Sequence, residues 1–240
     1  MTSAGGTAVA VLAQISRPFP DWEWFDERNI DELRELLVEH VILTALALLF
    51  GLLIAIPLAV AAVRWRRLYG PLLNVTGVLF TVPSAARFVL LLAVLPSSPP
   101  FGLRMGTSLI GLTIYTLLIL FRNTVAGLDS VPRDVTEAAT AMGYTPGRQL
   151  VRVEFPLALP VIMAGVRIAA VTTIGLVTVT AFIGQGGLGQ LFISGFRTQY
   201  PMEVAVGLVV SVVLAVVVDL LLVWTERQLT PWSQARGTRR

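Results

Sequence analysis

The chain contains no cysteine and no lysine, and His40 is its only histidine. Without cysteine there can be no disulfide or thiolate metal site, and a single histidine leaves no histidine-based catalytic triad. The absence of lysine excludes the nucleotide-binding loop whose lysine contacts phosphate, so we expect no ATP-hydrolysing site, metal, cofactor or enzyme activity in this chain. The basic charge comes from 18 arginines that are dispersed along the sequence, so we expect no nucleic-acid partner.

Charged side chains make up only 14% of the 240 residues, whereas 55% are hydrophobic, and the mean hydropathy is +0.77. A soluble domain averages about half apolar and about a quarter charged residues, so this composition predicts an integral membrane protein. Five apolar segments are long enough to cross a hydrocarbon core of roughly 30 Å as helices. They are residues 41–63, 71–95, 108–128, 157–183 and 203–224, and Pro83 interrupts the second. We therefore expect an all-α membrane protein with five transmembrane helices.

The first residues differ from the rest of the chain. An unpatterned start is followed by an acidic stretch in which apolar residues recur at helical spacing, which predicts an amphipathic helix. Trp22 and Trp24 within that stretch suit the headgroup interface. The expected division is an extracytoplasmic tail and amphipathic helix at 1–40, a transmembrane domain at 41–227 with a loop at 129–156, and a cytoplasmic tail at 228–240.

Arginines between the predicted spans indicate the orientation of the chain. Three lie at 64–70, three at 129–156 and four after Trp224, but only one at 96–107 and one at 184–202. Because positively charged loops stay in the cytoplasm, the N-terminus is predicted outside and the C-terminus inside. The loop at 129–156 then faces the cytoplasm.

This polar loop contains the start and stop signals of two short helices. Good helix formers follow Pro132 as far as residue 142, and Gly143 lies where a helix end needs a left-handed residue. A second helix is predicted at 146–153, and Pro156 is expected to separate it from the next span.

The loop resembles the cytoplasmic loop of ABC importer permeases. The resemblance rests on Glu137-Ala138-Ala139, then three residues, Gly143, nine residues, and Val153-Glu154-Phe155-Pro156. It implies a type I ABC importer permease fold, with the loop docked on a cytoplasmic ATPase dimer that holds ATP and Mg²⁺. The implied docking residues are Glu137, Ala138, Ala139, Gly143 and Pro156. An ordinary alanine-rich connector is the alternative.

Further segments resemble one subfamily, the osmoprotectant permeases for glycine betaine, carnitine and choline. They are Glu39-His40-Val41, Ile56-Pro57-Leu58, Thr81-Val82-Pro83-Ser84, Arg122-Asn123-Thr124, Ile162-Met163-Ala164-Gly165-Val166-Arg167 and Leu229-Thr230-Pro231. The resemblance implies a bacterial inner-membrane location, a second permease subunit, identical or homologous, and an extracytoplasmic substrate-binding protein. A permease for methionine or another solute, a stand-alone channel or secondary transporter, and a noncatalytic scaffold remain alternatives. Arg87 and Phe155 depart from the residues expected in the subfamily.

A glycine-rich stretch literally matches the dinucleotide-binding pattern GxGxxG, at Gly184, Gly186, Gly187 and Gly189. That pattern requires a strand before it and a helix after it, whereas a predicted membrane helix precedes it here. The stretch instead resembles the outer glycine-rich loop of the same permeases, where a delivered binding protein would make contact.

Charges within the predicted spans are expected to be paired or functional. Counting along the helices puts Asp219 at about the depth of Arg167 and Arg122, so we expect one of these arginines to neutralise it. Arg87 lies nearer the outer side and is expected to face a wet cavity or a subunit interface.

Aromatic residues of the second and third spans are candidates for the translocation pathway, because a ring face attracts a quaternary ammonium. The candidates are Phe80, Phe88 and Tyr115, with lipid-facing or core packing as the alternative. We expect Pro83 to Phe88 to form an outer gate in which a carbonyl cluster or an acid neutralises Arg87.

Overall fold

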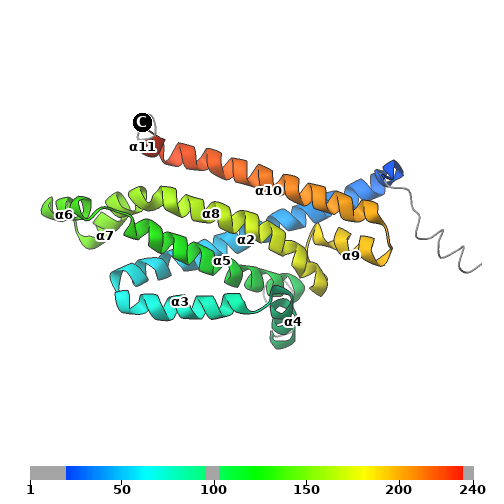
Figure 1. Ribbon diagram of the computed structural model, residues 1–240, viewed down its shortest axis with the longest axis horizontal. Coiled ribbons are helices and arrows are strands. Elements are labelled where there is room, and N and C mark those ends of the chain that lie inside the picture. Colours follow the sequence, from blue (N-terminus) through cyan, green and yellow to red (C-terminus); the bar gives the residue numbers. More distant parts are fainter. Residues whose placement is uncertain (1–19, 96–102, 235–240) are drawn as a thin grey trace, which may run out of the picture.

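The computed structural model describes residues 20–95 and 103–234, and every regular element in these ranges is a helix (Figure 1). The long elements are α2 (Glu27–Arg64), α3 (Arg66–Thr81), α4 (Ser84–Val94), α5 (Leu103–Asp129), α8 (Phe155–Val177) and α10 (Pro201–Leu229). Four helical segments of the described chain are long and apolar enough to cross a membrane, and α3 with α4 makes a fifth if a bent pair counts as one span. The all-α prediction is confirmed, and the five-span count stays a prediction. The ends of the predicted tails and part of the loop at 96–107 lie outside the described residues.

The second predicted span is not one straight helix. The chain bends by 97° between α3 and α4, at Val82 and Pro83. Proline has no N–H for a helical hydrogen bond and disfavours helical geometry in the residue before it. Val82 accordingly takes extended torsion angles, and α4 restarts with the Arg87 N–H donating to the Pro83 carbonyl at 2.9 Å.

The short helices lie in two groups at opposite ends of the molecule (Figure 1). The short helices α6 (Arg133–Ala141) and α7 (Pro146–Gln149) lie at one end, together with α11 (Pro231–Gln234). The start of α2 lies at the other end, together with α9 (Gly189–Arg197). The described chain thus begins and finishes at opposite ends, as an odd number of spans requires. Which end is cytoplasmic stays a prediction.

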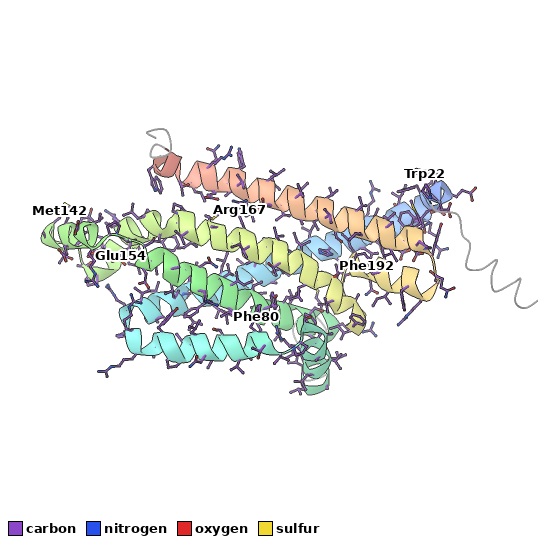
Figure 2. All side chains as sticks on the ribbon, viewed as in Figure 1. Trp22, Phe80, Met142, Glu154, Arg167 and Phe192 are labelled. Atoms are coloured by element: carbon purple, nitrogen blue, oxygen red, sulfur yellow. The ribbon has the colours of Figure 1, made fainter. Side chains whose placement is uncertain are left out.

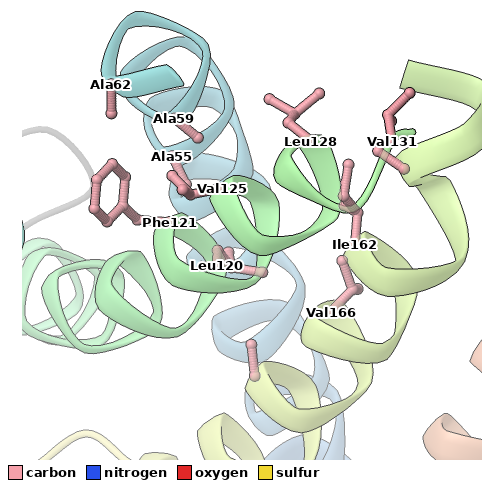
Figure 3. Packing of buried hydrophobic residues seen from close by; sticks show 12 residues of the cluster. Ala55, Ala59, Ala62, Leu120, Phe121, Val125, Leu128, Val131, Ile162 and Val166 are labelled. Carbon is pink, nitrogen blue, oxygen red and sulfur yellow. The ribbon is translucent and has the colours of Figure 1, made fainter. Parts of the chain in front are cut away.

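Small residues allow the central helices to approach closely (Figure 3). Ala55, Ala59 and Ala62 of α2 are fully buried in one cluster with Phe121 and Val125 of α5. Helix packing in membranes relies on such small residues, because lipid is as apolar as the side chains and gives no hydrophobic driving force between helices.

A second kind of packing closes the end where α2 begins. Trp24 is 3% exposed and clusters with Leu191, Tyr200 and Met202, so its ring packs inside the protein, and its depth at the headgroup interface stays a prediction. Trp22 in the same 3-10 turn, η1 (Trp22–Trp24), is 73% exposed, and Figure 2 shows it at the tip of the molecule. Sequence spacing could not separate the two rings, because the partners of Trp24 come from α9 and α10.

Candidate functional site

The loop at 129–156 forms the helix and turn that its sequence predicts. Helix α6 ends at Ala141, and Gly143 has a φ of +82°, in the left-handed region where an added Cβ is unfavourable. The Tyr144 N–H then donates to the Ala139 carbonyl at 3.1 Å, which closes the end of the helix. The turn therefore depends on local chemistry that the sequence shows.

Burial divides the predicted docking residues into two groups. Glu137 and Ala138 are exposed and Met142 is 70% exposed, whereas Ala139 is 1% exposed. Ala139 is therefore packed inside the loop and presents no side chain to a partner. The small Ala139 side chain allows α6 to pack against the rest of the loop. The accessible face of the loop is formed by Glu137, Ala138 and Met142, the last of which is labelled in Figure 2.

The break expected at Pro156 is absent. A π-helical turn, η2 (Leu150–Glu154), leads directly into α8, and residues Pro146–Ile183 form one helical segment. Pro156 occupies the first turn of α8, where its missing N–H removes least hydrogen bonding. The loop is consequently continuous with a long helix, so a displacement of the loop can be transmitted along α8.

Gln149 braces this connection, and no pattern in the sequence indicated it. It accepts a hydrogen bond from the Thr140 hydroxyl at 3.1 Å and donates one to the Glu154 carboxylate at 2.8 Å. Thr140 belongs to α6 and Glu154 to η2, so one side chain ties the two parts of the loop together.

A charged cleft of about 420 Å³ lies beside the loop. Its charged lining residues are Arg64, Arg66, Asp129, Arg133 and Glu154. Two hydrogen bonds, of 2.6 and 3.0 Å, join Arg66 to Asp129 and so link the start of α3 to the last residue of α5. The sequence predicted arginines at this end but not their partner.

The expected ion pair within the membrane-spanning segments is present. Arg167 of α8 donates to both carboxylate oxygens of Asp219 of α10, each at 2.9 Å, and its Nη1 lies 3.8 Å from a Glu226 oxygen. Figure 2 shows Arg167 between these two helices. Arg122 is exposed on α5 and forms no ion pair among the described residues, so it is not the partner of Asp219.

The α3–α4 bend gathers part of the predicted gate. Arg87 is 6% exposed, and its Nη2 donates to the Val82 carbonyl at 2.8 Å and to the Phe80 carbonyl at 3.4 Å. The carbonyl cluster expected around Arg87 is therefore present, whereas a wet cavity or a subunit interface beside it stays a prediction. Its guanidinium carbon lies 5.7 Å from the centre of the Tyr115 ring, and that ring stacks on Phe80 at 4.6 Å.

Phe88 does not belong to this group. It is fully buried, and a Cβ added to Gly111 of α5 would lie 2.4 Å from its ring. Phe88 thus fills the space that a glycine leaves, so core packing, the alternative, holds for this residue. The depth of Phe88 along its helix was predictable, but the direction in which it points was not.

Most of the glycine-rich stretch is buried in the protein, although Gly184 is exposed. Gly186, Gly187 and Gly189 are buried, and Gly184, Gly186 and Gly187 have positive φ. One carboxylate oxygen of Glu39 accepts hydrogen bonds from the Gln185 amide at 2.6 Å and from the backbone N–H groups of Gly186 and Gly187 at 2.9 and 3.1 Å. Contact of these buried glycines with a binding protein would therefore require the turn to open.

His40, the only histidine, supports the same region. It is fully buried, and its Nε2 lies 3.0 Å from the Ile174 carbonyl of α8. An added Cβ on Gly187 would lie 2.6 Å from the Leu36 carbonyl oxygen and 2.7 Å from the His40 Cβ. Glu39 and His40 together hold α2 against the turn and α8, a role that sequence reasoning did not assign to them.

Comparison with known proteins gives consistent matches over most of the chain. The family described as binding-protein-dependent transport system inner membrane component matches residues 47–231. The choline transport system permease protein OpuBB of Bacillus subtilis (strain 168) is 34% identical over 212 residues, which cover 88% of this chain and 95% of that protein. The glycine betaine/carnitine/choline transport system permease protein OpuCD of the same organism is 36% identical, with 82% and 84% covered. The osmoprotectant import permease protein OsmW of Salmonella typhimurium is also 36% identical, with 85% and 94% covered.

Among solved structures, an inward-facing form of the MetNI methionine ABC transporter is similar, with a TM-score of 0.69. The match covers 86% of this chain and 98% of that one, at 21% sequence identity. At this identity the likeness establishes the fold alone.

Proposed function

The chain belongs to the family of binding-protein-dependent transport system inner membrane components, and from this membership we propose that it is the permease subunit of an ATP-driven importer of quaternary-ammonium osmolytes. Glycine betaine, carnitine and choline are the proposed substrates. The observation that carries the proposal is the 34–36% identity, over more than four fifths of the chain, to permeases named for choline, for glycine betaine/carnitine/choline and for osmoprotectant import. A methionine transporter shares the fold, but a likeness at 21% identity favours no substrate.

In the proposed topology α3 and α4 together form the second of five spans, with the N-terminus outside and the C-terminus in the cytoplasm. The positions of the arginines support this orientation, because the charged cleft and α11 lie at the same end as the polar loop. The end that carries Trp22 then faces the extracytoplasmic side.

The loop is proposed to dock on a separate ATPase dimer, which supplies ATP and Mg²⁺. Glu137 and Ala138 are exposed on α6, and the turn at Gly143 presents Met142 beside them. Gln149 and the continuous helix into α8 support a mechanical link, because both make the loop and the span move together. Ala139 and Pro156 contribute to the shape of the loop rather than to its surface.

The remaining partners are proposed from exposed apolar surface. Most of α10 is unburied, with Leu208, Val212, Val216 and Leu220 exposed, as contact with lipid or with a second permease subunit requires. At the other end, Phe182 of η3 (Thr178–Ile183), the element before the glycine-rich turn, is 70% exposed, and Phe196 of α9 is 84% exposed. These two rings are the proposed contact with the substrate-binding protein, and Glu39 supports the turn that separates η3 from α9. The bend at Pro83 with Arg87 is the proposed outer gate.

The proposal is tested by purifying the chain with its ATPase and binding protein and measuring uptake into proteoliposomes. Uptake of glycine betaine or choline is expected to require both ATP and the binding protein. Ala138→Arg adds bulk on the exposed face of α6 and is expected to abolish ATPase association while membrane insertion persists. Gly70→Arg is the matched control, because Gly70 is exposed near the same end but outside the loop, with nothing within 4 Å of an added Cβ. Uptake without ATP would point to a channel or secondary carrier, and normal ATPase association of Ala138→Arg would contradict the docking face.

A further inference from the structure

Arg87 is a buried cation whose hydrogen-bonding capacity is mostly unused. A guanidinium carries five N–H groups, and the two on Nη2 are directed to the Val82 and Phe80 carbonyls. The other three, on Nε and Nη1, have no hydrogen-bond partner among the described residues. The ion pairs of the described chain involve other arginines, namely Arg34, Arg66 and Arg167. A buried charge in this state needs an acceptor, preferably an anionic one.

Two stacked aromatic rings lie beside this cation. Phe80 of α3 and Tyr115 of α5 have ring centres 4.6 Å apart, inclined by 30°, and the guanidinium carbon is 5.7 Å from the Tyr115 ring centre. An aromatic face attracts a quaternary ammonium without requiring a carboxylate. Donors for an anion and ring faces for a cation therefore lie within one small region.

One ring of this pair, Phe80, lines a groove that leads toward the end of the molecule where the polar loop lies. Phe80 lines a groove of about 650 Å³ that runs between α3 and α5. Leu118 and Ile119 line its wall, and Asp129 lies at its far end, next to the polar loop. Figure 2 shows Phe80 at the junction of α3 with the bend. The cluster thus lies at one end of a groove that runs along the predicted transport direction.

We propose that Arg87, Phe80 and Tyr115 form a recognition site for a zwitterionic quaternary-ammonium substrate, in which Arg87 binds the carboxylate and the rings bind the ammonium group. The inference rests on the proposed function and narrows its substrate class. A zwitterion such as glycine betaine supplies the anionic acceptor that the buried guanidinium lacks. Choline has no carboxylate, so the guanidinium repels its charge without compensation.

Access to the site requires the bend between α3 and α4 to change. Nε and Nη1 of Arg87 are buried, and the two carbonyls that hold Nη2 belong to Val82 and to Phe80, two residues earlier. A change at Pro83 therefore moves both the guanidinium and the ring of Phe80. The residue that breaks the helix is in this way part of the recognition site.

The test uses the complete complex in proteoliposomes with saturating binding protein. Under this condition differences in uptake between variants report transport through the permease and not capture of substrate by the binding protein. Uptake of radiolabelled glycine betaine and choline is measured separately for wild type, Arg87→Gln, Arg87→Lys and the control Arg67→Gln. Arg67 is a suitable control, because it is an exposed arginine of α3 that does not line the groove and has no ion pair among the described residues. Arg87→Gln is expected to lower kcat/KM for glycine betaine by about tenfold or more, the effect of losing charge-assisted hydrogen bonds. Choline uptake is expected to stay level or rise, and Arg87→Lys is expected to retain part of the glycine betaine uptake.

Equal losses for the two substrates, or no loss for either, would overturn the inference. A wild-type complex that carries choline but not glycine betaine would overturn the recognition site and leave the proposed function standing. A complex that carries neither substrate would overturn both. The thermal midpoint of the substrate-free complex identifies a variant that fails to fold. In that case Tyr115→Leu decides, because removal of the ring is expected to weaken uptake of glycine betaine, and unchanged uptake would contradict the site.

Discussion

Replacing Glu39 by alanine is expected to destabilise the end of the molecule where α2 begins, because one carboxylate oxygen organises the glycine-rich turn. That oxygen accepts two backbone N–H bonds, from Gly186 and Gly187, and one bond from the side chain of Gln185. The two glycines are buried and take left-handed torsion angles, with φ of +146° and +48°. Their N–H groups cannot easily turn to water when Glu39 is removed.

The size of the effect follows from these bonds. Each buried N–H left without an acceptor costs about 1–3 kcal/mol, so Glu39→Ala should lower the free energy of unfolding by about 2–6 kcal/mol. For a chain of this length, 1 kcal/mol corresponds to about 2–4 °C, so the thermal midpoint should fall by about 4 °C or more. Glu39→Gln keeps an acceptor oxygen but loses the charge, and is expected to have a smaller effect.

The measurement is thermal unfolding of the purified chain in detergent. Glu35→Ala is the matched control, since Glu35 is exposed one turn earlier on the same helix. The reasoning is refuted if Glu39→Ala unfolds at the same temperature as Glu35→Ala.

Three further changes test other parts of the structure. Arg167→Leu leaves Asp219 without its bidentate partner. It is expected to lower the thermal midpoint more than the double change Arg167→Leu with Asp219→Leu does. Additive effects of the two single changes would contradict the pairing. Gly143→Val is expected to lower the free energy of unfolding by about 1–2 kcal/mol. The cause is the backbone φ of +82° at this position alone, because nothing lies within 4 Å of the added Cβ. Gly147→Ala, also in open space, is the control, and co-purification with the ATPase checks whether only the first change weakens docking. Gly111→Val should overpack the ring of Phe88 and lower stability by about 1–3 kcal/mol, and Gly111→Val combined with Phe88→Leu should recover part of this loss.

The polar loop was the most predictable part of the candidate site. Its helix, its left-handed glycine and its place between two spans depend on neighbouring residues, so the spacing of Glu137 and Gly143 was sufficient. The expected break at Pro156 was wrong, because a proline in the first turn of a helix removes little hydrogen bonding and a π turn connects it to the loop. Docking of the loop on an ATPase stays a prediction.

Hydropathy, the arginine distribution and turn chemistry, which can be read along the chain, were enough to indicate an all-helical membrane protein and to pair Asp219 with an arginine at its depth. The fold decided which arginine, because a residue count along a helix gives height but not the direction in which a side chain points. Arg167 therefore meets Asp219 while Arg122 is exposed, and Phe88 turns into the core. Contacts between distant segments could not be predicted from the sequence. The hydrogen bond between Glu39 and Gly187, for example, joins residues that are 148 positions apart. Such contacts depend on how whole helices pack, and no local pattern records that packing.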